Sequence, residues 1–211
     1  MDRYSTIVPD AALIEKISGY FHQFLPLNLA EMAELASYCE IRRVSKKSIL
    51  IEEGETEDFL NLVVQGIVMK YIRMPRGEMI LQLATEGHII SAEISFLSRQ
   101  PSQVIIETLE PTMMISLSYT KMQEALEKFS RGEELGRSIL ENMYVKKDEK
   151  KYMWMVMGVR ERFMHYMEHH PHMLQRVSQK YLASYLNIKP ETFSRLKHLT
   201  RKPGGSNNHK S

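Results

Sequence analysis

The spacing of the apolar residues changes twice along the chain, from helical to strand-like and back to helical. Between residues 11 and 39, Ile14, Ile17 and Phe21 recur at intervals of three and four, which is the spacing of one helix face. Pro26 interrupts this run, and the apolar residues resume after it. The pattern therefore predicts two helices before residue 40.

From residue 41 to residue 117 the pattern is that of short strands. The apolar and β-branched runs are residues 48–51, 60–64, 67–72, 79–83, 88–90, 104–108 and 113–117. Glycines separate many of these runs every ten to twelve residues, at Gly54, Gly66, Gly77 and Gly87. Short strands with turn residues at this rhythm are typical of a compact antiparallel sandwich or barrel.

Residues 119–159 return to a helical pattern, which Gly132 is expected to interrupt. Leu135, Ile139 and Met143 then follow one another at steps of four, and Met153 continues the apolar face after a block of charged residues. A long helix with one apolar stripe can pair with its own copy. These four residues are the predicted dimer interface; packing of the helix on its own chain is the alternative.

Two short helices are predicted in residues 179–198. The apolar positions are Leu182, Leu186, Ile188, Phe193 and Leu196. Asn187 tolerates the left-handed conformation that ends a helix, and Pro190 suits the first position of the next one. Ala183 is small enough for two helices to cross closely. This pattern is typical of a helix-turn-helix, which lays its second helix in the DNA major groove.

The charge distribution favours this reading over an ordinary helical hairpin. Residues 171–211 contain eight Lys and Arg against a single acid, Glu191. The whole chain has 28 basic and 26 acidic residues, so residues 1–170 hold 20 against 25. A basic end on an otherwise acidic chain is the electrostatic footprint of a nucleic-acid-binding module.

Composition places the chain among ordinary globular proteins. Its 211 residues are 43% hydrophobic and 26% charged, and no apolar run approaches the length of a membrane span. The single cysteine, Cys39, permits neither an internal disulfide nor an iron–sulfur centre. With no signal-peptide pattern at the N-terminus, a cytoplasmic protein is expected. The tail, residues 203–211, is rich in Gly, Asn and Ser and is expected to be disordered.

The sequence contains no pattern of an enzyme. No nucleophile–base signature, phosphate-binding loop or dinucleotide fingerprint is present, so no catalytic residue and no cofactor are assigned. His165 and His169 are four residues apart and could chelate a metal on one helix face, but surface histidines at a helix end are the favoured interpretation. The 15 methionines suit gap-filling in a core and indicate no haem or copper site.

A β-rich domain, a long helix and a basic helix-turn-helix, in that order, resemble the Crp/Fnr family of bacterial transcription regulators. The similarity lies mainly in ILIEEGETEDFLNLVVQGIVMKYI and YLASYLNIKPETFSRLK. The run RERFMHYMEHHPHMLQRVSQKYLASYLNIKPETFSRL resembles most closely the Bacteroidetes branch of the family. The resemblance implies an α+β protein with an N-terminal antiparallel, cyclic-nucleotide-binding-like β-roll. The implied domains are residues 1–120 (the roll and flanking helices), 121–158 (the dimerisation helix) and 159–211 (the helix-turn-helix domain).

The resemblance also implies which residues contact double-stranded DNA. They lie at the start of the second helix: Lys189, Pro190, Glu191, Thr192, Ser194, Arg195 and Lys197. Arg195 can bind guanine O6 and N7 together, and Glu191 can accept a hydrogen bond from cytosine N4. The alternative reading of Glu191 is an acidic residue that interacts favourably with the helix dipole in the first turn. Pro190 stands where the family's cyclic-AMP receptors have Arg, so their operator sequence is not assumed.

The segment that matches the family's phosphate-binding cassette, residues 91–104, departs from it. The cyclic-AMP binders have a glutamate on the ribose and, ten residues later, an Arg–Ser pair on the phosphate; here these positions are Ala92, Ser102 and Gln103. A buried phosphate without Arg lacks a charged bidentate partner. The candidate effector-pocket residues are Ser91, Ala92, Glu93, Arg99, Ser102 and Gln103. Arg99, three positions early, and Glu93, one late, are possible local substitutes.

The sequence therefore predicts a sequence-specific DNA-binding regulator. It is expected to act as a homodimer on an inverted repeat, to be insensitive to cyclic AMP, to answer to another small-molecule effector or none, and to have RNA polymerase as a partner. The alternative hypothesis is a small-ligand sensor of the cyclic-nucleotide type that acts through protein partners.

Overall fold

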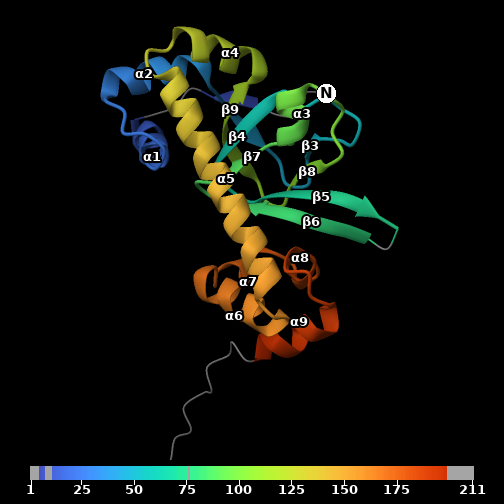
Figure 1. Ribbon diagram of the computed structural model, residues 1–211. Helices are drawn as coiled ribbons and strands as arrows, with labels where there is room; N and C mark the ends of the chain where they lie inside the picture. Colours follow the sequence, from blue (N-terminus) through green and yellow to red (C-terminus); the bar gives the residue numbers. More distant parts are fainter. Residues whose placement is uncertain (1–4, 8–10, 76, 199–211) are drawn as a thin grey trace, which may run out of the picture. The chain divides into compact units, whose positions relative to one another are not determined.

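The computed structural model of the chain describes residues 5–7, 11–75 and 77–198 (Figure 1). Its strands are β1 (Ser5–Ile7), β2 (Glu40–Val44), β3 (Ile49–Ile51), β4 (Phe59–Gln65), β5 (Val68–Met74), β6 (Gly77–Ala84), β7 (Ile89–Ile90), β8 (Ile105–Thr108) and β9 (Thr112–Ser118). Its helices are α1 (Ala11–His22), α2 (Leu29–Tyr38), α3 (Glu93–Ser98), α4 (Tyr119–Lys128), α5 (Gly132–Val156), α6 (Val159–His169), α7 (Met173–Arg176), α8 (Gln179–Tyr185) and α9 (Pro190–Lys197). The chain divides between Lys147 and Asp148 into two compact units.

The N-terminal unit is built on two antiparallel sheets. One has the strand order β1-β2-β9-β4-β7 and the other β3-β8-β5-β6. An apolar cluster between them includes Val63, Val68, Ile90, Ile106 and Met114. The predicted antiparallel roll is thus confirmed, and each of the seven predicted runs overlaps a strand from β3 to β9.

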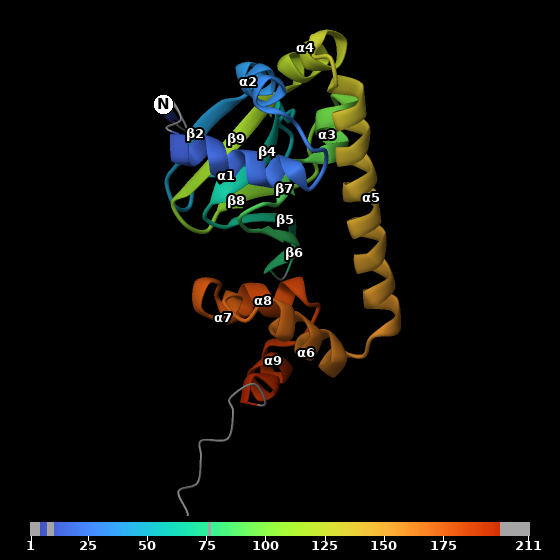
Figure 2. The ribbon, with the colours of Figure 1, turned by 90° about the vertical axis from the view of Figure 1, so that its left-hand side faces the viewer.

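A helical layer covers the outer face of the first sheet (Figure 2). Its apolar core joins Ile41, Leu62 and Ile115 of the sheet to residues of α1, α2, α4 and α5. Pro26 lies between α1 and α2, as expected, and Asn28 caps α2 by accepting a hydrogen bond from the Glu31 backbone N–H at 3.0 Å. This packing explains why the first sheet has buried residues on both faces.

Glycine residues fit two places where the chain leaves no room for a side chain. A Cβ atom on Gly66 would lie 2.6 Å from the Thr112 hydroxyl, and the φ angle of Gly66 is 104°. A Cβ atom on Gly132 would lie 2.2 Å from the Ala125 carbonyl oxygen, where α5 begins against α4. The predicted interruption at Gly132 is therefore a real helix boundary, and residues 121–158 form two helices instead of one.

The C-terminal unit contains the end of α5 and helices α6 to α9. Its buried core includes Phe163, Met167, Met173, Val177 and Leu182. A serine cap begins α8, where Ser178 accepts a hydrogen bond from the Tyr181 backbone N–H at 3.3 Å. The predicted disorder of the tail, residues 203–211, and the basic residues Arg201, Lys202 and Lys210 lie outside the described residues.

Candidate functional site

Helices α8 and α9 are joined by a turn of the predicted type. Asn187 has a φ angle of 51°, and Pro190 is the first residue of α9. The Ile188 backbone N–H donates to the Ala183 carbonyl at 2.9 Å, which ties the turn back to α8. The residues that break one helix and begin the next are therefore the ones identified from the sequence.

One side of α9 is anchored in the core of the C-terminal unit. Phe193 is 0% exposed, and its ring meets Phe163 of α6 edge to face, with centroids 5.1 Å apart and planes at 84°. Leu182, Leu186 and Ile188 are buried with it. The predicted apolar face is confirmed for these residues, while Leu196 is only half-buried.

The opposite side of α9 carries the candidate DNA-contacting residues. Lys189, Pro190, Glu191, Ser194 and Arg195 are exposed, and Thr192 and Lys197 are half-buried. Glu191 and Arg195 are four residues apart, so they lie on one helix face. The helix thus presents a guanidinium, a carboxylate and a hydroxyl on one surface, and the aromatic ring of Phe193 fixes its rotation about its own axis.

The candidate effector residues of the N-terminal unit lie on the segment from β7 through α3 to β8. Ser91, Ala92 and Ser102 are buried, and Gln103 is exposed. Ser102 turns back on its own loop, because its hydroxyl donates to the Val104 carbonyl at 2.7 Å. The segment is therefore packed against the roll, and the hydroxyl proton of Ser102 is used locally.

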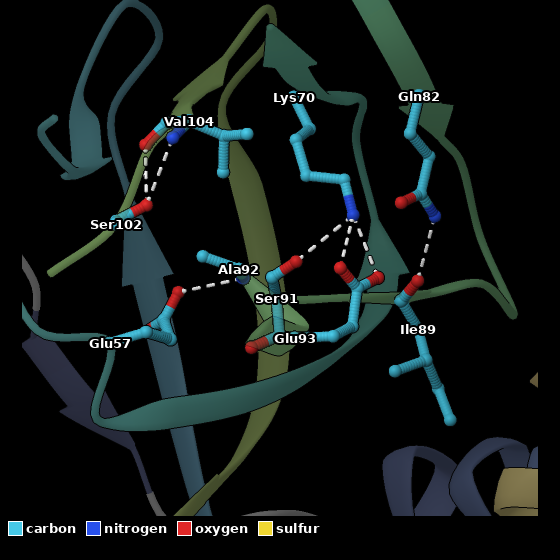
Figure 3. A network of polar contacts seen from close by, with 9 residues as sticks. All are labelled: Glu57, Lys70, Gln82, Ile89, Ser91, Ala92, Glu93, Ser102 and Val104. Carbon is cyan, nitrogen blue, oxygen red and sulfur yellow. Dashed lines mark hydrogen bonds and ion pairs between the residues drawn. The ribbon is translucent and has the colours of Figure 1, made fainter. Parts of the chain in front are cut away.

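An ion pair that was not predicted from the sequence joins the buried Lys70 of β5 to the partly exposed Glu93 (Figure 3). The Lys70 ammonium donates to both Glu93 carboxylate oxygens, at 2.7 and 2.6 Å, and to the Ser91 carbonyl at 3.1 Å. The sequence signal that could have revealed Lys70 is its position as a single charged residue inside the apolar run IVMKYI. Glu93, one of the candidate effector residues, is thus paired with a lysine of its own chain.

Glu57 lies on the other side of Ala92. Its carboxylate accepts hydrogen bonds from the backbone N–H groups of Phe59 at 3.0 Å and Ala92 at 3.3 Å. Burial raises the pKa of the Glu57 carboxyl above its ordinary value, and these hydrogen bonds act in the opposite direction. Glu57 was not identified from the sequence, because acidic residues cluster throughout residues 52–58.

Arg99, the possible substitute for the missing cassette arginine, is engaged at the far end of α3. Its guanidinium forms an ion pair with Asp58, donates to the Glu57 carbonyl at 2.6 Å and lies 4.3 Å from the centre of the Tyr119 ring. The backbone of Arg99 itself has a φ angle of 59°. Recruiting Arg99 to a phosphate would therefore require all three contacts to break.

Cyclic AMP is accordingly expected not to bind at micromolar concentration. The positions of the cassette's Arg–Ser pair hold Ser102 and Gln103, and each lost charge-assisted hydrogen bond forfeits about 1.5–3 kcal/mol. Two such bonds amount to about a thousandfold in affinity. Isothermal titration calorimetry checks this, and a low-micromolar dissociation constant would contradict it; Arg99→Ala would then show whether Arg99 had moved to the phosphate.

Part of the predicted pairing face of α5 is buried against its own chain. Leu135 is 4% exposed and belongs to the core beneath the helical layer, and Ile139 is partly buried against that core. Met143 and Met153 are half-buried. The large apolar side chains that α5 exposes are Leu140, Tyr144, Val145, Tyr152, Met155 and Val156.

The histidines near Pro171 make ring contacts with one another. The rings of His165 and His169 have centroids 4.2 Å apart, and the Nδ1 of His169 contacts the His165 carbonyl at 2.8 Å. Within residues 5–7, 11–75 and 77–198, no group of three His, Cys, Asp or Glu side chains is arranged to hold a metal ion. The same described ranges include no helix with the length and apolarity of a membrane span.

Comparisons with known proteins identify the fold of residues 41–129 in the N-terminal unit. The family model of the cyclic nucleotide-binding domain matches residues 41–129. No curated protein sequence matches the chain.

Solved structures share the fold at low sequence identity. A cyclic nucleotide-binding domain from Methylobacillus flagellatus is 20% identical, with a TM-score of 0.63 and coverage of 74% of this chain and 91% of its own. The global regulator CLP of Xanthomonas campestris, described as responsive to c-di-GMP, is 17% identical, with a TM-score of 0.61 and coverage of 82% and 91%. The catabolite activator protein of Thermus thermophilus is 19% identical, with a TM-score of 0.52 and coverage of 83% and 84%. Residues 41–129 therefore form a domain of the cyclic nucleotide-binding fold.

Proposed function

We propose that this protein is a sequence-specific DNA-binding transcription regulator of the Crp/Fnr type, and that α9 is its recognition helix. The observation that carries the proposal is the division of α9 into two faces. Phe193 is fully buried, whereas Glu191 in the first turn and Ser194 and Arg195 further along the helix are exposed. A helix held by one aromatic anchor, with such groups outward, suits insertion into a major groove.

The exposed groups have the chemistry of base and phosphate recognition. Arg195 can donate two hydrogen bonds to guanine, and Glu191 can accept one from cytosine. Ser194 and Thr192 can donate to phosphate oxygens, and Lys189 and Lys197 can neutralise them. The Glu191 and Arg195 side chains are one helical turn apart on α9, so they would reach neighbouring base pairs of one half-site.

The similar structures support a regulatory role. CLP of Xanthomonas campestris is described as linking cell-cell signalling to virulence gene expression, and the Thermus thermophilus protein is a catabolite activator. The Bacteroidetes resemblance of the C-terminal sequence stays a prediction.

Selection of bound DNA from a random pool tests the proposal. Enrichment of one inverted-repeat sequence is expected, and a gel shift with the selected fragment should show salt-dependent binding. Recovery of no preferred sequence would contradict DNA recognition and would favour the alternative, a ligand sensor that acts through protein partners.

Arg195→Ala is expected to weaken binding to the selected site by about 1–3 kcal/mol and to leave binding to random DNA nearly unchanged. Lys197→Ala is the matched control on the same helix: it should weaken both alike and flatten the salt dependence, because it would remove a phosphate contact. Gel shifts on both DNAs at two salt concentrations measure these effects. Equal losses on specific and random DNA for Arg195→Ala would remove Arg195 from the base readers.

We further propose that the protein is a homodimer that pairs through the exposed apolar face of α5. Leu140 and Tyr144 are one turn apart and are 54% and 71% exposed, on the side of the helix away from Leu135 and Ile139. Of the interface expected from the sequence, Leu135 is buried in its own chain, and a role for Ile139, Met143 and Met153 stays a prediction. A two-fold dimer would present its two recognition helices to half-sites about 34 Å apart, one turn of DNA.

The double change Leu140→Asp and Tyr144→Asp is expected to give monomers that bind the full inverted repeat poorly, because charged residues would then face one another across the interface. Leu29→Asp is the control, since Leu29 is 81% exposed at the start of α2 and should leave the dimer intact. Sedimentation at micromolar concentration measures the oligomeric state. An unmodified protein that sediments as a monomer would rule out this interface.

A further inference from the structure

Lys70 is a buried cation in an apolar environment. It lies on β5, where it pairs in register with Gln82 of β6 and Ile106 of β8. It is 7% exposed. Two residues before it, Val68 belongs to the apolar cluster between the sheets, as do Ile106 and Ala92. The ammonium group therefore lies beside the interior of the roll, away from bulk water.

Stability alone does not account for this lysine. Removing two charges from water often costs more than their attraction returns, and apolar residues of similar volume are frequently as good or better. The residues of β5 next to Lys70 are Met69 and Tyr71, both buried, and Val68 belongs to the apolar cluster. A charge kept at such a position suggests that it binds something.

A second observation points to a ligand. The hydroxyl of Ser91 is buried, at 0% exposure, and its oxygen has no hydrogen-bond partner among the described residues. Native structures leave few buried hydroxyls unpaired. The carbonyl of the same residue accepts a hydrogen bond from Lys70. The segment at Ser91 thus faces Lys70 with its carbonyl and carries an unused hydroxyl on its other side (Figure 3).

We propose that Lys70 is the anion-binding group of a ligand site in the roll, which the Glu93 carboxylate occupies in the ligand-free protein. Both oxygens of Glu93 contact the Lys70 ammonium (Figure 3). The Glu93 side chain is 32% exposed, so it can leave Lys70 for water without crossing the core. A ligand carboxylate that takes its place keeps Lys70 paired and leaves the buried charge unchanged.

The surroundings define the ligand as a small apolar monocarboxylate. One lysine balances one negative charge, so the dianion of inorganic phosphate would leave an unpaired charge in a low-dielectric place. The neighbouring Ile106 and Ala92 favour a hydrocarbon or aromatic tail.

Glu93 acts as a tethered competitor of the ligand. A group held by the chain has an effective concentration in the millimolar range or above. Wild-type protein should therefore bind a free carboxylate weakly, and removal of the Glu93 charge should strengthen binding. The proposal is independent of DNA binding, so its failure would leave the proposed regulator intact.

Titration of the full chain with benzoate, followed by NMR, tests the proposal. Glu93→Gln is expected to bind benzoate at least tenfold more tightly than wild type, and adding Lys70→Met to it should abolish the gain. Benzamide, the neutral isostere, should bind neither protein. Should Glu93→Gln fail to fold, wild type and Lys70→Met are compared by the rise in melting temperature with benzoate and with benzamide.

Three results would overturn the proposal. One is equal benzoate affinity in wild type and Glu93→Gln, or an equal thermal response in wild type and Lys70→Met. Another is equal binding of benzoate and benzamide. A third is displacement of benzoate by micromolar cyclic AMP, which would replace the monocarboxylate with a nucleotide.

Discussion

Phe193→Ala is expected to destabilise the C-terminal unit by about 3–5 kcal/mol, the usual cost of removing a buried phenylalanine. Phe193 is fully buried and supplies the ring that meets Phe163 edge to face. Such an aromatic pair contributes about 0.5–1.5 kcal/mol beyond its buried area. The cavity would lie between α6 and α9, so the orientation of the proposed recognition helix should be lost together with stability.

The protein offers a local probe and a matched control for this measurement. Trp154 is the single tryptophan of the chain and lies at the end of α5 in the C-terminal unit, so its fluorescence during urea unfolding reports on that unit. Arg195→Ala, on the exposed face of the same helix, should change the free energy of unfolding by less than about 0.5 kcal/mol. A loss below about 1 kcal/mol for Phe193→Ala would contradict the packing of α9.

Local sequence signals were sufficient for most of the strands and for the α8–α9 turn. Gly66 and Asn187 have positive φ angles that few other residues adopt readily, and Pro190 suits the first position of a helix. Their positions along the chain therefore define turns and helix ends. The strand β2 was missed because its sequence, EIRRV, reads as polar. Its Arg42 is nevertheless buried, where it donates to the Ser116 hydroxyl at 2.7 Å.

The partners of charged residues depend on the fold and were not predictable from spacing. Lys70 and Glu93 are 23 residues apart. They meet because the sheet that contains β5 packs against the sheet that contains β7, which leads into α3. Leu135 illustrates the same point for apolar residues. Its step of four to Ile139 correctly indicates a helix face, but the sequence does not say whether that face packs on its own chain or on a second copy.

Glu93→Gln is expected to lower the free energy of unfolding of the N-terminal unit by about 3 kcal/mol. Removing one partner of a buried ion pair typically costs about 3–5 kcal/mol, because the other charge is left uncompensated. The lower value applies here because Glu93 is partly exposed and because an amide oxygen still accepts one hydrogen bond from Lys70. Lys70→Met should instead be neutral or stabilising, since methionine suits the apolar cluster and the half-exposed Glu93 can turn to water.

The double variant measures the interaction energy between Lys70 and Glu93. With Lys70→Met in place, Glu93→Gln should cost less than about 0.5 kcal/mol, because no buried cation remains to be neutralised. Urea unfolding of the four proteins, followed by circular dichroism, gives the interaction energy from the double-mutant cycle. Additive effects of the two changes would mean that Lys70 is not held by Glu93. The tethered carboxylate would then lose its role as the competitor that a free ligand must displace.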